Sequence, residues 1–235
     1  MTSTVGSRTL LEALGEVRDP ELDEPITVLG FVASAEVSAD GEAEVHLRLP
    51  TYFCAPNFAY LMVADAYDAV SMVDGVRRAA VFLDDHFAAD AINDGVAAGA
   101  GFVGSFAGEA VEELGSLRAT FLRKAVLAGT DQVCRPLVDA GATPKDLAEL
   151  TVGAAPPSPA LDRLLRRRAE LGLPCGKDAP LLVDPGSGAP IAADAVPLHL
   201  RKARVTRTSL DANTGICRGM LRHRYATDGQ GEEER

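Results

Sequence analysis

Tryptophan is absent from the 235-residue sequence, and aromatic residues make up only 5% of it. A stacking platform for bases or sugars therefore has little material from which it could be built. The four cysteines, Cys54, Cys134, Cys175 and Cys217, lie far apart and include no CxxC pair. Their spacing argues against a disulfide scaffold and against a self-contained zinc or cluster motif, and it fits a reducing compartment.

Long apolar runs and an excess of basic residues are also missing. No stretch approaches the length of a membrane-spanning helix, and the first residues lack a basic segment followed by an apolar run. The formal net charge is -11, from 23 Lys+Arg and 34 Asp+Glu. Because phosphate neutralisation needs a positive surface, we expect no nucleic-acid or membrane partner, and we expect a cytoplasmic protein.

Apolar residues are plentiful, at 47% with a mean hydropathy of +0.06, so the chain can bury a core. The charge is unevenly distributed. Residues 1–95 hold 5 Lys+Arg and 17 Asp+Glu, whereas residues 96–235 hold 18 and 17. This asymmetry favours two units. We expect an α/β domain at 1–95, a mainly helical extension with a few strands at 96–225, and a disordered tail at 226–235.

The first 95 residues alternate between helical and strand-like patterns. Apolar spacing predicts helices over 9–17 and 57–73. Period-two alternation predicts strands over 26–37, 43–49 and 76–85, and Asp40-Gly41 between the first two predicts an antiparallel hairpin. The predicted fold is α+β, with the element order αββαβ and a three-stranded sheet.

The remaining sequence is mostly helical in pattern. Apolar spacing predicts helical segments from about residue 109 to residue 138, and Thr143-Pro144 and Ser158-Pro159 are start signals for two further helices. Residues 181–191 suggest a strand and a turn, and residues 196–208 suggest another strand.

Cys54 stands between a predicted strand and a predicted helix, in the sequence Cys54-Ala55-Pro56. An isolated cysteine is commonly a small buried apolar residue. At a helix N-terminus, however, free backbone N–H groups and the helix dipole favour thiolate over thiol, and the thiolate is the form that binds soft metals or attacks electrophiles. Both interpretations stay open on the sequence alone.

Acidic and imidazole side chains stand near other strand ends of the same unit. Asp19 and Glu21 precede the first strand, and Asp85 and His86 follow the third. If the second and third strands both run antiparallel to the first, these residues could converge with Cys54 at one rim of the sheet. Carboxylate, imidazole and thiolate are ligand types for iron or zinc, although acidic loops at strand ends are often solvated turns.

Residues 8–90 resemble the MIP18 (DUF59) family, which includes PaaD-like and SufT-like iron-sulfur assembly factors. The resemblance is carried by the short first helix, Asp19-Pro20-Glu21-Leu22, Leu29-Gly30-Phe31, the Asp-Gly hairpin and Cys54-Ala55-Pro56 before a helix. The chain departs from the family pattern at Tyr52 and Phe53, where small flexible residues are usual, and its long extension is atypical.

The resemblance implies a function. Cys54 would be the key thiol, with Asp19 and Glu21 as acidic partners, and the protein would transiently bind iron or an iron-sulfur cluster and deliver it to a client metalloprotein. A soluble di-iron monooxygenase is the client that the resemblance suggests, and two copies of the chain could pair through the hairpin edge. Two alternatives stay open: an acyl-transfer or hydrolytic enzyme with Cys54 as nucleophile and His86 as base, and an adaptor that binds its client without metal.

Overall fold

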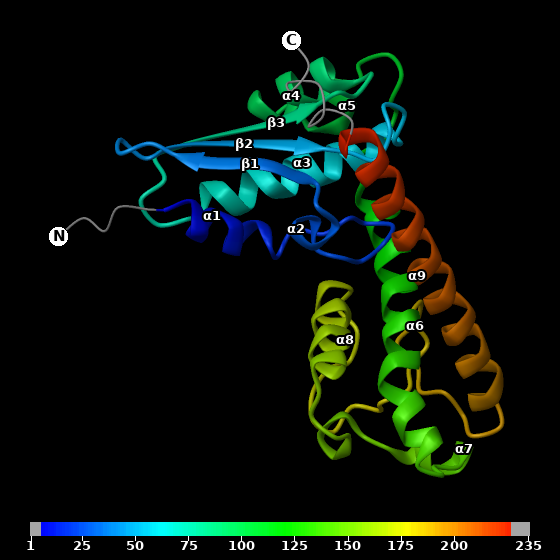
Figure 1. Ribbon diagram of the computed structural model, residues 1–235. Coiled ribbons are helices and arrows are strands. Elements are labelled where there is room, and N and C mark those ends of the chain that lie inside the picture. Colours follow the sequence, from blue (N-terminus) through cyan, green and yellow to red (C-terminus); the bar gives the residue numbers. More distant parts are fainter. Residues whose placement is uncertain (1–5, 227–235) are drawn as a thin grey trace. The chain divides into compact units, whose positions relative to one another are not determined.

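The sheet predicted for the N-terminal part is present in a computed structural model that describes residues 6–226 (Figure 1). The chain forms two compact units. The first comprises Met1–Gly115 together with Asn213–Arg235, and the second comprises Ser116–Ala212. None of the helices in the described part is long and apolar enough to cross a membrane.

Three strands form the sheet, in the order β1-β2-β3. Strand β1 (Val32–Val37) pairs antiparallel with β2 (Glu42–Arg48), and β3 (Arg78–Asp84) pairs parallel with β2. The strand directions required for a common rim are therefore confirmed: β1 begins where β2 and β3 end. The alternation in β2 buries Ala43, Val45 and Leu47 and exposes the residues between them to a greater degree.

The first predicted strand was too long at its start. Residues Ile26–Leu29 form the short helix α2, not a strand. Pro25 fixes the backbone before this turn, and Gly30 ends it with a φ of 79°, a left-handed conformation that favours glycine. The chain thus turns sharply before β1, which closes the acidic loop that contains Asp19.

Helices α1 (Ser7–Leu14) and α3 (Pro56–Ser71) cover the same face of the sheet (Figure 1). Helix α4 (Ala89–Ala97) packs against β3 and α3, and α5 (Gly101–Ser105) follows it. The expected boundary at residue 95 falls inside α4, and the first unit continues to Gly115 because α4 buries Ile92 and Val96 in the same core. The last turns of α9 (Val196–Ala226) also belong to this unit and place Leu221 in its core.

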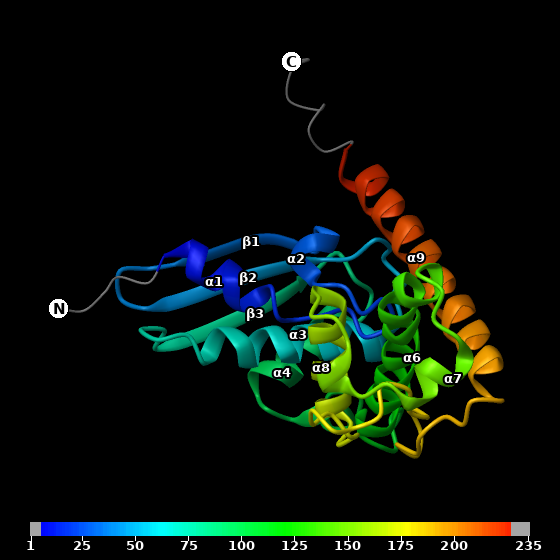
Figure 2. The ribbon, with the colours of Figure 1, turned by 90° about the horizontal axis from the view of Figure 1, so that it is seen from below.

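The second unit is helical. It contains α6 (Gly115–Asp139), α7 (Pro144–Glu149), the 3-10 turn Val152–Ala154, α8 (Pro159–Glu170) and the first part of α9. Helices α6 and α8 lie side by side in both views (Figure 1 and Figure 2), and a Cβ on Gly129 would stand 3.4 Å from the side chain of Leu164. The predicted cap at Thr143 is confirmed by its reciprocal hydrogen bonds with Asp146.

Two strand predictions in this unit are wrong. Residues 181–191 form a turn with one isolated bridge between Val183 and Pro190. Residues 196–208 lie in α9, whose buried residues Val196, His199 and Ala203 follow helical spacing. The alternation of apolar residues suggested a buried strand face, but two of these residues, Leu198 and Val205, are exposed on the helix. The predicted disordered tail lies, except for Ala226, outside the described residues.

Candidate functional site

Cys54 lies in the loop that joins β2 to α3. Pro50 follows the end of β2, and α3 begins at Pro56, where the missing N–H of proline costs no helical hydrogen bond. The Cys54 side chain is half-buried against the core of the first unit, and its Sγ lies 3.3 Å from the hydroxyl oxygen of Thr51. The thiol is therefore at the start of the helix, as predicted, and is still partly accessible.

Asp19 lies in a closed loop between α1 and α2. Its carboxylate accepts hydrogen bonds from the backbone N–H groups of Glu21 at 2.8 Å and Leu22 at 2.9 Å, and the residue is only 8% exposed. Burial raises the pKa of Asp19 to about 6, and the two backbone hydrogen bonds oppose that rise. Among the described residues, Asp19 has no cationic side chain within ion-pair distance. The carboxyl group is thus held by the backbone in an environment that disfavours its charge.

His86 faces the backbone of the Cys54 loop. Its Nε2 lies 2.7 Å from the carbonyl oxygen of Cys54, and its Nδ1 accepts the N–H of Ala88 at 3.2 Å. These contacts fix a neutral imidazole that donates from Nε2, and burial lowers the pKa of His86. Both ring nitrogens are occupied by backbone groups, so His86 positions the loop and does not hold the thiol proton in this arrangement.

Asp85 contacts the end of α9. The hydroxyl of Tyr225 lies 3.4 Å from its carboxylate, and Arg224 donates to its backbone carbonyl at 2.6 Å. Arg224 also donates to the carbonyl of Leu49 at 3.0 Å, so one guanidinium joins the ends of β2 and β3 to α9. The predicted acidic side chain at the end of β3 is therefore engaged by α9.

The structure adds Cys217 to this region. Cys217 lies one helical turn before the buried Leu221 and is half-buried against the same core as Cys54. Burial raises the pKa of the Cys217 thiol to about 11, and the charges of Asp19, Cys54 and Glu21 act in the same direction. Cys217 is thus near enough to three of the five predicted residues to feel their charges, although no local spacing connects it with them.

A complete metal centre is not pre-formed in this region. Across residues 6–226, no group of three or more His, Cys, Asp and Glu side chains is arranged to hold a metal ion. The donor types do fit iron, because thiolates and carboxylates are both iron ligands. The charges of Asp19, Glu21 and Cys54 act on Cys217, whereas His86 binds the backbone carbonyl of Cys54 and Asp85 contacts Tyr225.

Three exposed aromatic rings flank Cys54. Tyr52, Phe53 and Phe87 are 48%, 77% and 50% exposed, and their ring centroids lie 5.0 to 6.3 Å apart. The N–H of Phe87 donates to the carbonyl of Tyr52, which ties the loop after β3 to the Cys54 loop. Clustered exposed rings are unusual on a free surface, and here they form an apolar patch on the Cys54 loop and the loop after β3.

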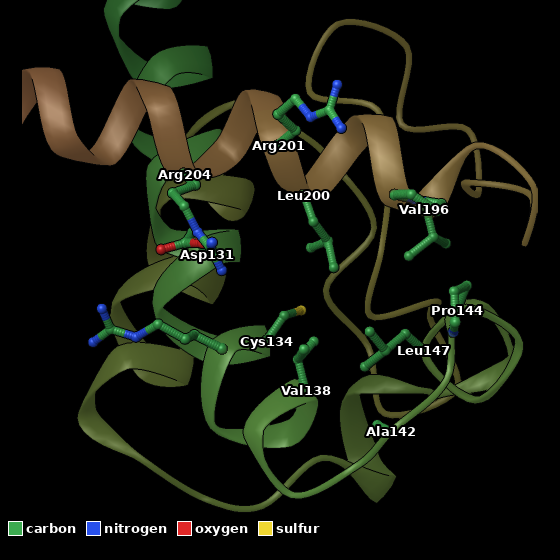
Figure 3. Close-up of a pocket in the computed structure, with 12 residues that line it drawn as sticks. Asp131, Cys134, Val138, Ala142, Pro144, Leu147, Val196, Leu200, Arg201 and Arg204 are labelled. Atoms are coloured by element: carbon green, nitrogen blue, oxygen red, sulfur yellow. The ribbon is translucent and has the colours of Figure 1, made fainter.

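The second unit has a cavity of about 340 Å³ between α6, α7 and α9. Figure 3 shows the side chains of Cys134, Leu147, Val196 and Leu200 around one space, with the guanidinium of Arg204 beside Asp131. Asp131 is already paired with Arg207 at 2.6 Å. Burial raises the pKa of Cys134 to about 12, which favours the unreactive thiol over the thiolate at neutral pH. The cavity therefore offers apolar contacts but no reactive group at Cys134.

Comparison with known proteins identifies a family domain within the first unit. Residues 7–81 match the family described as iron-sulfur cluster assembly protein. No curated protein and no solved structure matches the chain. The match extends from the start of α1 into β3 and includes Asp19, Glu21 and Cys54. Residues 7–81 are therefore a domain of the iron-sulfur cluster assembly (MIP18, DUF59) family, and this chain carries it together with an additional C-terminal region.

Proposed function

We propose that this protein assembles or delivers iron or an iron-sulfur cluster, which it holds transiently at Cys54 and passes to a client metalloprotein. The observation that carries the proposal is the position of Cys54: a partly accessible thiol at the N-terminus of α3, within the domain that matches the assembly family. The cargo is a substrate in this function, so a site with few protein ligands suits it, because ligands from the donor or client can enter and displace the thiol.

Each neighbouring group has a role in this proposal. Asp19 contributes a buried negative charge when it is ionised, which favours a cation nearby. His86 fixes the backbone at Cys54 through its 2.7 Å contact and keeps the thiol at the rim. The rings of Tyr52, Phe53 and Phe87 limit water beside the sulfur and offer apolar contact to the client.

Anaerobic loading tests the metal role of Cys54. Wild-type protein, Cys54→Ala and Cys175→Ala are incubated with ferrous iron and sulfide, and bound iron and visible cluster absorbance are measured per chain. Cys175 is the control because it is exposed and lies in the second unit. We expect Cys54→Ala to lose most of the bound cargo and Cys175→Ala to keep it. Equal loading of wild type and Cys54→Ala would reject Cys54 as the cargo ligand.

The client is the finer part of the proposal. We propose a di-iron monooxygenase as the client, on the basis of the family resemblance alone. The test is transfer of iron to an iron-free di-iron monooxygenase component. One sample receives the loaded protein and the other receives the same amount of free iron, and the recovered activity of both is measured with a chelator present. Recovery that a chelator abolishes equally in both samples would argue against delivery. The expected pairing of two copies is tested by the mass in solution.

A further inference from the structure

A cleft in the first unit lies between α2 and the end of β2 on one side and the last turns of α9 on the other. Its volume is about 880 Å³. Val28 and Leu221 contribute apolar wall, and Arg48, Arg218 and Arg222 contribute charge. All lining residues belong to the same compact unit, so the cleft is a property of that unit alone.

The charge of this cleft is opposite to that of its unit. Residues 1–115 and 213–235 contain 9 Lys+Arg and 24 Asp+Glu, a net charge of -15. No aspartate or glutamate lines the cleft, yet three of the nine basic residues do. In a unit with so many carboxylates, arginines normally find acidic partners on the surface, so three arginines together without one indicate a site for an external anion.

The contacts of the three arginines support this interpretation. Arg48 donates from Nε to the carbonyl of Gly30 at 3.4 Å, and its guanidinium lies 4.8 Å from the ring centre of Tyr225. Arg222 donates to the carbonyl of Arg218 at 3.4 Å. The Nε of Arg218 is buried and has no hydrogen-bond acceptor in the described part of the chain. None of the three forms an ion pair with a described carboxylate, so their charge is available to a ligand.

The form of the cleft indicates the class of ligand. A guanidinium presents a planar fork that matches a carboxylate or a phosphate. The cleft is much larger than an inorganic anion, and Val28, 56% exposed, adds apolar surface beside the charges. A peptide fits the lining better than a nucleic acid does, because Tyr225 is the single aromatic ring among the lining residues on which a base could stack, whereas Val28, Leu29 and Leu221 offer apolar contact. An acidic peptide segment that also carries apolar side chains satisfies all these features.

We propose that the cleft formed by Arg48, Arg218 and Arg222 binds a carboxylate-rich, partly apolar segment of a partner protein. The inference rests on the proposed function only for the identity of that partner, which would be the client or the donor of the cargo. Arg48 neighbours Leu49, whose carbonyl binds Arg224 of α9, so a partner in the cleft contacts the same helix end that carries Cys217.

The probe for the test is a fluorescein-labelled peptide of alternating glutamate and leucine, and its binding is followed by fluorescence anisotropy at low salt. The variant is Arg48→Gln/Arg218→Gln/Arg222→Gln, checked for folding by circular dichroism. The matched control is Arg77→Gln/Arg78→Gln, which removes two cations of the same unit that do not line the cleft. We expect the cleft variant to bind the peptide at least about tenfold more weakly, and the control to bind like wild type.

Several results would overturn the proposal. These are no binding by wild type, equal binding by the cleft variant, equal binding of a peptide with glutamine in place of glutamate, and displacement by inorganic phosphate at the concentration of the peptide. Residues 227–235 include Glu232, Glu233 and Glu234, so deletion of this segment tests whether it occupies the cleft itself. A higher peptide affinity after the deletion would show that the occupant is this segment and not a partner protein. Cargo loading of the cleft variant is measured in parallel, so a failure of the cleft and a failure of the Cys54 role are distinguished.

Discussion

The buried carboxyl of Asp19 should destabilise the metal-free protein at neutral pH, and its replacement by asparagine should relieve that cost. Asparagine keeps a side-chain oxygen for the backbone N–H groups of Glu21 and Leu22 but carries no charge. Burial raises the pKa of Asp19 from 3.8 to about 6, so the folded protein prefers the protonated form. The stabilising contribution of Asp19 is full below 3.8 and is lost as the pH rises through about 6.

The magnitude follows from linkage. Above both pKa values, the rise from 3.8 to about 6 corresponds to about 3 kcal/mol of lost unfolding free energy. At about pH 4.5 only about 1 kcal/mol of it has been lost, since this pH is only slightly above the unfolded pKa of 3.8 and the folded protein still holds the proton. Asp19→Asn should therefore gain about 2 kcal/mol over wild type between about pH 4.5 and about pH 7.5.

Urea unfolding of chelator-treated protein at the two pH values measures this difference. Asp68→Asn is the control, because Asp68 is an exposed carboxylate on α3 of the same unit. Any fixed effect of the amide on the two hydrogen bonds is the same at both pH values and cancels. A gain for Asp19→Asn that does not grow with pH, or that the control shows equally, would refute the reasoning. Bound iron should reduce the gain, because a nearby cation favours the ionised carboxylate.

The remaining predictions concern Cys217 and Arg168. At about pH 8 the Cys217 thiol, with a pKa of about 11 in place of 9.0, should be alkylated by iodoacetamide about 90-fold more slowly than a peptide thiol, as followed by mass spectrometry. A rate equal to that of the peptide would contradict the burial of the Cys217 thiol. Arg168 is fully buried and donates to the carbonyls of Pro174, Pro180 and Leu181, so Arg168→Met should lower the unfolding free energy of the second unit by about 2 to 4 kcal/mol in urea. The exposed neighbour Arg166→Met should change it little.

The sequence predicted most elements of the first unit correctly, because each element is specified by residues only a few positions apart. The alternation of β2, the Asp40-Gly41 turn and Pro56 at the start of α3 each act within a few residues, and the structure confirms all three. The strand pattern over 26–37 does not reveal α2, because Gly30 has a left-handed conformation that ends a helical turn and separates Ile26–Leu29 from β1. In α9 the valine and threonine residues favoured a strand, and the packing of Val196 and Ala203 on one helical face overrode that preference.

The candidate site was only partly predictable, for a physical reason. Cys54, Asp19 and Glu21 lie within the part of the chain that matches the family, so their sequence context points to them. Cys217 is 163 positions after Cys54, and its place depends on where α9 packs. That packing is set by Leu221 in the core and by Arg224 on two backbone carbonyls, interactions that leave no periodic or spacing signal near Cys54.

The end of α9 is therefore part of the first unit, although the family match does not include it. The match ends at residue 81, yet the core of the same unit includes Leu221, and the site region includes Cys217. A guanidinium from α9 joins the ends of β2 and β3, beside the loops that hold Cys54 and His86. The last turns of α9 are thus part of the architecture of the unit that carries Cys54, although they lie outside the residues that match the family.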